Sequence, residues 1–274
     1  MEQRNKDSIT NFNKDLMKNL TVIFLMFLSF PVFSQKKNDT REFYEFRIYH
    51  FVSQGQGLEI NTYLEKSLLP ALHRRGLKNI GVFTALSNDT AATKDIYVLI
   101  PYKDLSEKLK ADDQLLSDKD FLSSGTGYID ATFDKAPYAR FETILMQAFR
   151  LAPVMQKPVL NGPRENRIYE LRSYESATEK IYRNKVEMFN EGGEVALFKR
   201  LGFNAIFYAD VISGSRMPNL MYMTSFEDKA SRDAHWKTFV DDPEWKRLSA
   251  LPQYQKNVSK ADIIFLRPTN YSDY

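Results

Sequence analysis

The chain repeats one six-residue pattern after 125 residues. YEFRIY at residues 44–49 returns as YELRSY at residues 169–174. Three more blocks recur in the same order at nearly the same spacing: a helix-like run that ends on glycine, a strand followed by Asp104 or Asp228, and a short closing apolar strand. Several blocks repeated in one order indicate an internal duplication. The chain is therefore expected to hold two copies of one small α+β unit.

Hydrophobic periodicity predicts the order strand, helix, strand, strand, helix, strand in each copy. The first copy has expected strands at 43–51, 79–86, 95–102 and 139–146, with helices at 57–75 and from 104. The second has expected strands at 167–175, 204–212, 219–226 and 260–266, with helices at 178–201 and 228–249. This order is that of the ferredoxin-like βαββαβ unit. Its sheet is covered by helices on one face only, so the two sheets are expected to pair face to face within the chain.

The domain boundaries follow from the repeat. Residues 42–147 form the first predicted domain and residues 167–268 the second. The stretch between them, 148–166, shows no sustained period and contains Pro153, Pro158, Gly162 and Pro163. Proline and glycine at this density are typical of a linker.

The N-terminal region carries the pattern of a secretory signal. Lys18 precedes an apolar run from Leu20 to Phe30, and Ser34 follows before a polar stretch. The run is shorter than the roughly 20 residues that a membrane span needs. A signal peptide over 1–34 is therefore predicted, with 1–16 an over-called start before Met17, and an uncleaved anchor is the alternative. The mature protein is then expected to be periplasmic or secreted, with no stable membrane span.

Composition excludes several classes of function. The 38 basic and 35 acidic residues are interleaved and leave a net charge of +3, which gives no indication of a nucleic-acid partner. The absence of cysteine removes disulfides, thiolate nucleophiles and iron–sulfur clusters. The three histidines lack the spacing of a metal site, and nucleophile-elbow, dinucleotide and P-loop glycine motifs are missing. No metal and no cofactor are expected.

Alternating polar residues on the repeated strand are the first candidates for a site. Side chains alternate between the two faces of a strand. We assign Tyr44, Phe46 and Ile48 to the helix-facing side, and hence place Glu45, Arg47 and Tyr49 toward the second sheet. The second copy repeats the division, with Glu170, Arg172 and Tyr174 directed toward the first sheet. Such rows either form satisfied ion pairs that join the sheets or line a ligand cavity.

Two further signals lie on the last long helix of the second copy. His235 and Trp236 occur there, and the first copy has no histidine at the corresponding position. A lone helical histidine is usually structural, and contact with a ligand is the alternative. Asp242-Pro243 then predicts a helix restart, with Asp242 as the cap and Trp245 packed in the core.

The second copy resembles the NIPSNAP family. The resemblance rests on IYELRSY at 168–174, Gly202 before a strand, 219–226, and DDPEW at 241–245. The first copy resembles the family more weakly, because it keeps YEFRIY but lacks the Asp-Pro-x-Trp element. The resemblance implies the dimeric α/β-barrel superfamily, which includes cofactor-free monooxygenases, haem-using enzymes and isomerase-like proteins. It implies no settled activity, and the eukaryotic members carry mitochondrial and vesicle-traffic associations that a secretory signal does not match.

Three functions remain open from the sequence. The first is an exported protein that binds a small apolar or aromatic ligand, and the second is a cofactor-free monooxygenase- or isomerase-like enzyme. The third is a structural subunit, and a homo-oligomer is compatible with each. The candidate catalytic residues are His235, Arg172, Tyr174 and Glu170, and the candidate ligand-binding residues are Arg172, Tyr174, Arg47, Tyr49 and Trp236. A pocket beside His235 and Tyr174 would favour the enzyme, and a filled interior the structural subunit.

Overall fold

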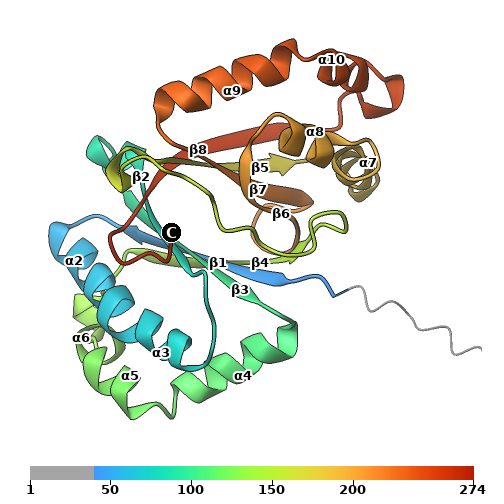
Figure 1. Ribbon diagram of the computed structural model, residues 1–274. Coiled ribbons are helices and arrows are strands. Elements are labelled where there is room, and N and C mark those ends of the chain that lie inside the picture. Colours follow the sequence, from blue (N-terminus) through green and yellow to red (C-terminus); the bar gives the residue numbers. More distant parts are fainter. Residues whose placement is uncertain (1–39) are drawn as a thin grey trace, which may run out of the picture. The chain divides into compact units, whose positions relative to one another are not determined.

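Eight antiparallel strands close into a barrel in the computed structural model, which describes residues 40–274 (Figure 1). The predicted signal peptide lies outside the described residues. The barrel order is β1-β3-β2-β8-β5-β7-β6-β4. The strands are β1 (Phe43–Phe51), β2 (Gly81–Ala85), β3 (Lys94–Tyr102), β4 (Arg140–Ala148), β5 (Ile168–Glu175), β6 (Asn204–Ser213), β7 (Asn219–Phe226) and β8 (Lys260–Pro268).

Each half of the chain contributes four neighbouring strands, and the two sets meet at two seams. The first seam pairs Phe83–Ala85 of β2 with Leu266–Pro268 of β8. The second pairs Leu145–Ala148 of β4 with Ala209–Ser213 of β6, with an irregularity in the register. The predicted pairing of the two sheets within one chain is therefore observed, and their edges are hydrogen-bonded as well.

Helices cover the barrel on two opposite sides (Figure 1). Those of the first half lie on one side: α2 (Gln54–Tyr63), a π-helical turn (Leu64–Leu68), α3 (Leu69–Arg74), α4 (Leu105–Leu115), α5 (Lys119–Ser124) and α6 (Thr126–Ile129). Those of the second half lie on the other: α7 (Glu179–Phe189), α8 (Glu194–Arg200), α9 (Lys229–Asp241) and α10 (Pro243–Ser249). Within residues 40–274, no helix combines the length and apolarity that crossing a bilayer requires.

Capping side chains fix where the long helices begin. Asp104 accepts the backbone N–H of Glu107, and Asp228 accepts that of Ser231, so the repeated Asp caps α4 and α9 in the same way. Ser53 caps α2, which is why the first helix begins at Gln54 and not at residue 57 as predicted.

Two predicted long helices are each divided in two. The helix expected over 178–201 is α7 and α8, because the chain turns at 190–193 and Gly193 adopts φ 95°. The helix expected over 228–249 is α9 and α10. The predicted restart is confirmed there: Asp242 accepts the N–H of Glu244, and Pro243 occupies the first turn. Trp245 packs 4.5 Å from Phe239, centroid to centroid.

The barrel interior is apolar, and this reverses our assignment of strand faces. Tyr44, Phe46, Tyr169 and Leu171 lie in one buried cluster shared by both halves. Tyr49 instead packs with the helices of the first half. The predicted orientation of the Glu-Arg-Tyr rows toward the opposite sheet is therefore wrong. Inside the barrel the charged rows would meet an apolar cluster, whereas the helices bring Lys108 and Arg232 to the two carboxylates on the outer face.

Candidate functional site

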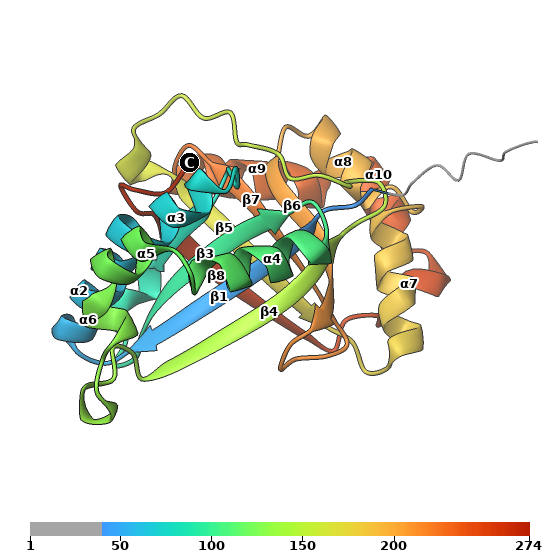
Figure 2. The same cartoon turned by 90° about the horizontal axis from the view of Figure 1, so that it is seen from below.

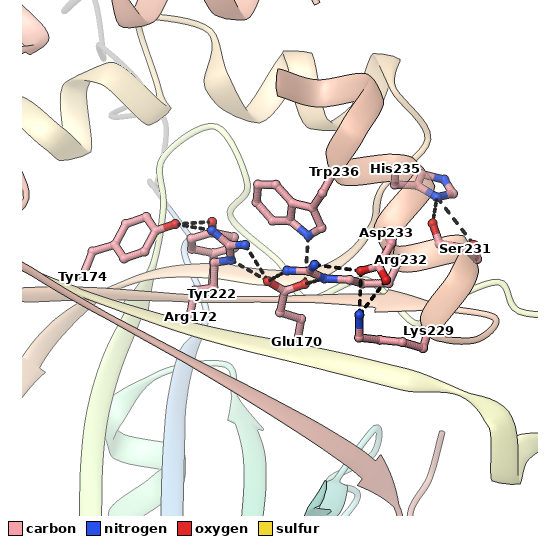
Figure 3. Close-up of polar contacts among 10 residues, drawn as sticks. All are labelled: Glu170, Arg172, Tyr174, Tyr222, Lys229, Ser231, Arg232, Asp233, His235 and Trp236. Carbon is pink, nitrogen blue, oxygen red and sulfur yellow. Dashed lines mark hydrogen bonds and ion pairs between the residues drawn. The ribbon is translucent and has the colours of Figure 1, made fainter. Parts of the chain in front are cut away.

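The Glu170 cluster lies between β5 and α9 (Figure 3). Glu170 is fully buried, and one of its oxygens accepts from Nε of Arg172 at 2.7 Å on the same strand. The carboxylate also receives two N–H groups of Arg232, at 2.7 and 2.9 Å, and the indole N–H of Trp236 at 2.8 Å. Both oxygens are engaged by donors from strand and helix, so the carboxylate fixes α9 to the sheet.

The charge balance keeps Glu170 ionised. Burial alone would raise the pKa of Glu170, but hydrogen bonds from Arg232 and the charge of Arg172 outweigh it and hold the pKa below the ordinary value. Arg232 is itself shared, because it also donates to Asp233 at 2.9 Å. The cluster therefore behaves as a fully paired buried ion network.

Arg172 is enclosed by neighbouring side chains. Its Cζ lies 3.6 Å from the ring centroid of Trp236, within cation–π distance. Its Nη1 donates to the hydroxyl of Tyr174 at 2.8 Å, and that hydroxyl lies 2.9 Å from the hydroxyl of buried Tyr222. The structure thus brings together the predicted residues Glu170, Arg172, Tyr174 and Trp236, and packs them against one another.

His235 lies apart from this cluster (Figure 3). Its Nδ1 lies 2.7 Å from the carbonyl oxygen of Ser231, one turn earlier in α9. Its ring packs 5.5 Å from those of Phe203 and Phe226. The predicted set of His235 with Arg172 and Tyr174 therefore does not converge on one space.

The first half builds a smaller version of the same network. Glu45 accepts from Arg47 and from the hydroxyl of Tyr102, each at 3.0 Å, and Lys108 lies 3.8 Å away. Burial alone would raise the pKa of Glu45, but Arg47 lowers it overall. Nη2 of Arg47 lies 3.7 Å from Asp112.

Tyr49 takes part in an aromatic cluster next to this network. Its ring lies 4.9 Å from Phe141, 6.2 Å from Tyr128 and 6.4 Å from Tyr138. Among residues 40–274, no group of three or more His, Asp or Glu side chains is arranged to hold a metal ion.

A groove lies elsewhere, beneath the linker between β4 and β5. It encloses about 420 Å³. The linker forms one wall, and α8 with the start of β6 forms the other. The lining residues are Leu151, Ala152, Pro153, Val154, Gln156, Lys157, Pro158, Val159, Val195, Lys199, Phe203, Asn204, Ala205, Ile206, Phe207 and Tyr208.

Backbone hydrogen bonds hold the linker against β6, along the outside of the molecule (Figure 2). Phe149 donates its N–H to the carbonyl of Tyr208, and Gln156 donates to that of Ile206, each at 2.8 Å. Ile206 is the bulged residue between the β6–β7 pairs at Ala205 and Phe207, so its carbonyl is available to the linker. Farther along, the carboxylate of Glu227 accepts the N–H groups of Asn161 and Gly162.

Sequence reasoning missed this groove. The prolines predict a linker over 148–166, but the pattern does not show that this stretch returns along β6. A β-bulge has no reliable signature in an isolated strand, and the groove depends on one. The run of apolar residues within the linker, from Leu151 to Val154, is the signal that could have indicated a covered surface.

Comparison with family models decides the relationship of the second half. Residues 169–273 match the NIPSNAP family model. From this match we refer to residues 169–273 as the NIPSNAP domain. The Glu170 cluster and the β6–α8 wall of the groove lie within it, and the linker precedes it. Comparison with curated proteins found no significant match.

Solved structures show the fold of the NIPSNAP domain together with the first half. A provisionally assigned monooxygenase from Lactobacillus acidophilus NCFM aligns with a TM-score of 0.55 at 12% identity, over 83% of this chain and 94% of that one. Another from Fusobacterium nucleatum aligns at 0.57 and 9% identity, over 84% and 93%. An uncharacterised NIPSNAP-like domain protein from Burkholderia xenovorans aligns at 0.36 and 18%, over 39% and 90%. At these identities the first two show a shared antiparallel α/β-barrel fold.

Proposed function

We propose that this chain is a binding protein that takes a small apolar or aromatic ligand into the linker groove. The observation that carries the proposal is the groove's lining, which is dominated by aliphatic and aromatic side chains and includes Phe203, Phe207 and Tyr208. Ligand sites in proteins are concave, mostly apolar and about 300–1,000 Å³ in volume. The groove meets each of these criteria.

Binding is favoured over cofactor-free oxygenase or isomerase chemistry. Such an enzyme needs a base and a polarising group that face the same substrate cavity. The best candidates are Glu170 and Arg172, and they bind each other. Glu170 also accepts hydrogen bonds from Arg232 and Trp236. The likeness to provisionally assigned monooxygenases supports a shared fold, and a shared fold does not by itself imply a shared reaction.

Two further parts of the proposal concern history and location. The matching strand order of the two halves supports an origin as tandem ferredoxin-like repeats. The apolar run from Leu20 to Phe30 supports export and a periplasmic or secreted place of action. A binding protein in that setting would meet ligands outside the cytoplasm.

The test uses N-phenyl-1-naphthylamine, an uncharged aromatic probe whose fluorescence rises in apolar surroundings. We expect saturable binding by the mature protein. Ala205→Trp should fill the groove, and Val159→Asp should make its exposed rim polar, so each should weaken binding at least tenfold. Ala250→Trp, on the exposed end of α10 outside the groove, is the matched control.

Thermal melts accompany each titration, because a tryptophan in the groove could also unfold the protein. Val159 is 75% exposed, so Val159→Asp should keep the parental melting temperature. Parental affinity in a folded Val159→Asp variant, together with parental affinity in Ala205→Trp, would place the probe elsewhere and overturn the proposal.

A further inference from the structure

We propose that the ligand of the linker groove is an amphipathic anion, an apolar body that ends in a carboxylate, and this rests on the proposed binding function. The groove supplies apolar side chains along its length. Its only charged lining residues are Lys157 and Lys199, and both are positive. An apolar site whose charged residues are all positive favours a ligand that has an apolar body and a negatively charged end.

Neither lysine is neutralised by the protein. Across residues 40–274, no ion pair involves Lys157 or Lys199, whereas other exposed lysines have partners, such as Lys229 with Asp233 at 2.6 Å. The local sequence explains this for Lys199: the positions four residues away on either side are Val195 and Phe203, both of which line the groove.

The acids nearest in sequence to the groove walls are already engaged: Glu194 pairs with Lys185 at 2.9 Å, and Asp210 accepts the hydroxyl of Tyr182 at 2.5 Å. Glu191 pairs with Arg150, and Glu227 holds the backbone of the linker. Asp242 pairs with Arg200, the residue after Lys199. The position of Lys199 in the last turn of α8 is favoured by the helix dipole, but that effect does not reach Lys157 on the linker. Two unpaired cations from separate segments therefore face one groove.

The two lysines are both exposed, which fits recognition of a head group that stays partly hydrated. The apolar body would supply most of the affinity, at about a three- to fourfold gain for each methylene buried. Each exposed cation adds a smaller term, so a carboxylate should bind about three- to tenfold more tightly than an uncharged analogue at low salt. That preference should shrink as salt is added.

The test compares decanoate, decanol and decyltrimethylammonium, each below its aggregation concentration, as competitors of N-phenyl-1-naphthylamine. We expect decanoate to displace the probe best and decyltrimethylammonium least. Lys157→Met with Lys199→Met should bring decanoate to the level of decanol and leave decanol unchanged. Lys180→Met, an exposed lysine of α7 outside the groove, is the matched control and should change neither.

The outcomes separate the two proposals. Displacement by decanol and decanoate with equal affinity, unaffected by the lysine changes, would overturn the anion preference and leave the apolar groove standing. Tighter binding of the cation would also overturn it. If none of the three competitors displaces the probe, or the probe does not bind, the proposed binding function fails as well.

Discussion

Trp236 lies over the guanidinium of Arg172, with 3.6 Å between the ring centroid and Cζ, while its indole N–H binds Glu170. The position 124 residues earlier is Asp112, which lies 3.7 Å from Arg47. The same shift relates Arg232 to Lys108. Both halves thus hold one Glu–Arg pair beneath a helix. The helix places an indole on the arginine in the NIPSNAP domain and a carboxylate near it in the first half.

Removing the central carboxylate of the NIPSNAP domain should be costly. Glu170→Leu leaves Arg172 and Arg232 side by side without their shared partner, and we expect a loss of about 3–5 kcal/mol in the free energy of unfolding. The double variant with Arg172→Leu should recover part of that loss, because Arg232 keeps Asp233. Urea denaturation measures both. Exposed Glu165→Leu is the control, and a single variant as stable as this control would contradict the reading of Glu170 as a buried hub.

The stability conferred by Glu170 should vanish in acid. Its pKa in the folded state is below the ordinary 4.5, since Arg232 and Arg172 outweigh the effect of burial. The contribution is therefore fully present above the unfolded pKa and is lost as pH falls through the folded one. The stability difference between parent and Glu170→Gln should stay constant from pH 8 to about 5 and shrink below that. A difference that widens in acid would give the pKa shift the opposite sign.

The isolated NIPSNAP domain should associate with itself. A fragment of residues 164–274 would expose the edges of β6 and β8 and the barrel-facing side chains Tyr169, Leu171 and Met223. Bare sheet faces and open edges favour pairing with another chain. Sedimentation over a range of concentrations measures this. A fragment that stays monomeric and folded would mean that the barrel seams are dispensable.

The linker should be sensitive at Gly162. A Cβ added there would lie 2.8 Å from Oε2 of Glu227, the carboxylate that anchors the linker backbone. Gly162→Ala should therefore displace that carboxylate and cost about 1.5–3 kcal/mol, the value of hydrogen bonds to a charged group. Gly55→Ala, whose Cβ would meet its nearest atom at 3.9 Å, should be neutral or stabilising in helix α2. Equal melting temperatures for the two variants would remove the proposed anchoring role of Glu227.

Export can be tested directly in the native cell envelope. The signal-like segment predicts a mature protein that begins near residue 35. Edman degradation or N-terminal peptide mapping of the protein recovered from that fraction reads the start. An intact N-terminus at or before Met17, found in the cytosol, would refute export.

The sequence predicted the bounds of the strands closely, because each element of the repeat occurs twice and the two occurrences can be compared. The observed β1 and β7 begin and end where they were predicted, at residues 43–51 and 219–226. Which face of each strand points into the barrel was not predictable in the same way. Alternation shows that Glu170 and Arg172 share a face, but both faces of β5 are buried, so polarity alone cannot show which one lies inside the barrel.

The contents of the candidate site depended on contacts between distant residues. Arg232 reaches Glu170 across 62 positions, and an arginine on a polar helix gives no sign of its partner. Trp236 is predicted to contact a ligand, and the fold shows what the sequence does not: its ring lies over Arg172 and its indole N–H binds Glu170. The groove needed both the bulge at Ile206 and the path of the linker, which only the folded chain brings together.

The two seams of the barrel have a consequence for how this chain can evolve. When two identical chains form an interface around a two-fold axis, every substitution appears on both sides at once. Here β2 meets β8 and β4 meets β6, so each seam joins two different sequences. A substitution in one seam therefore leaves the sequence of the other seam unchanged. The same freedom extends to the helices, where the first half has Asp112 at the position of Trp236 in the second, and to the linker, which occurs once and forms its groove against the second half.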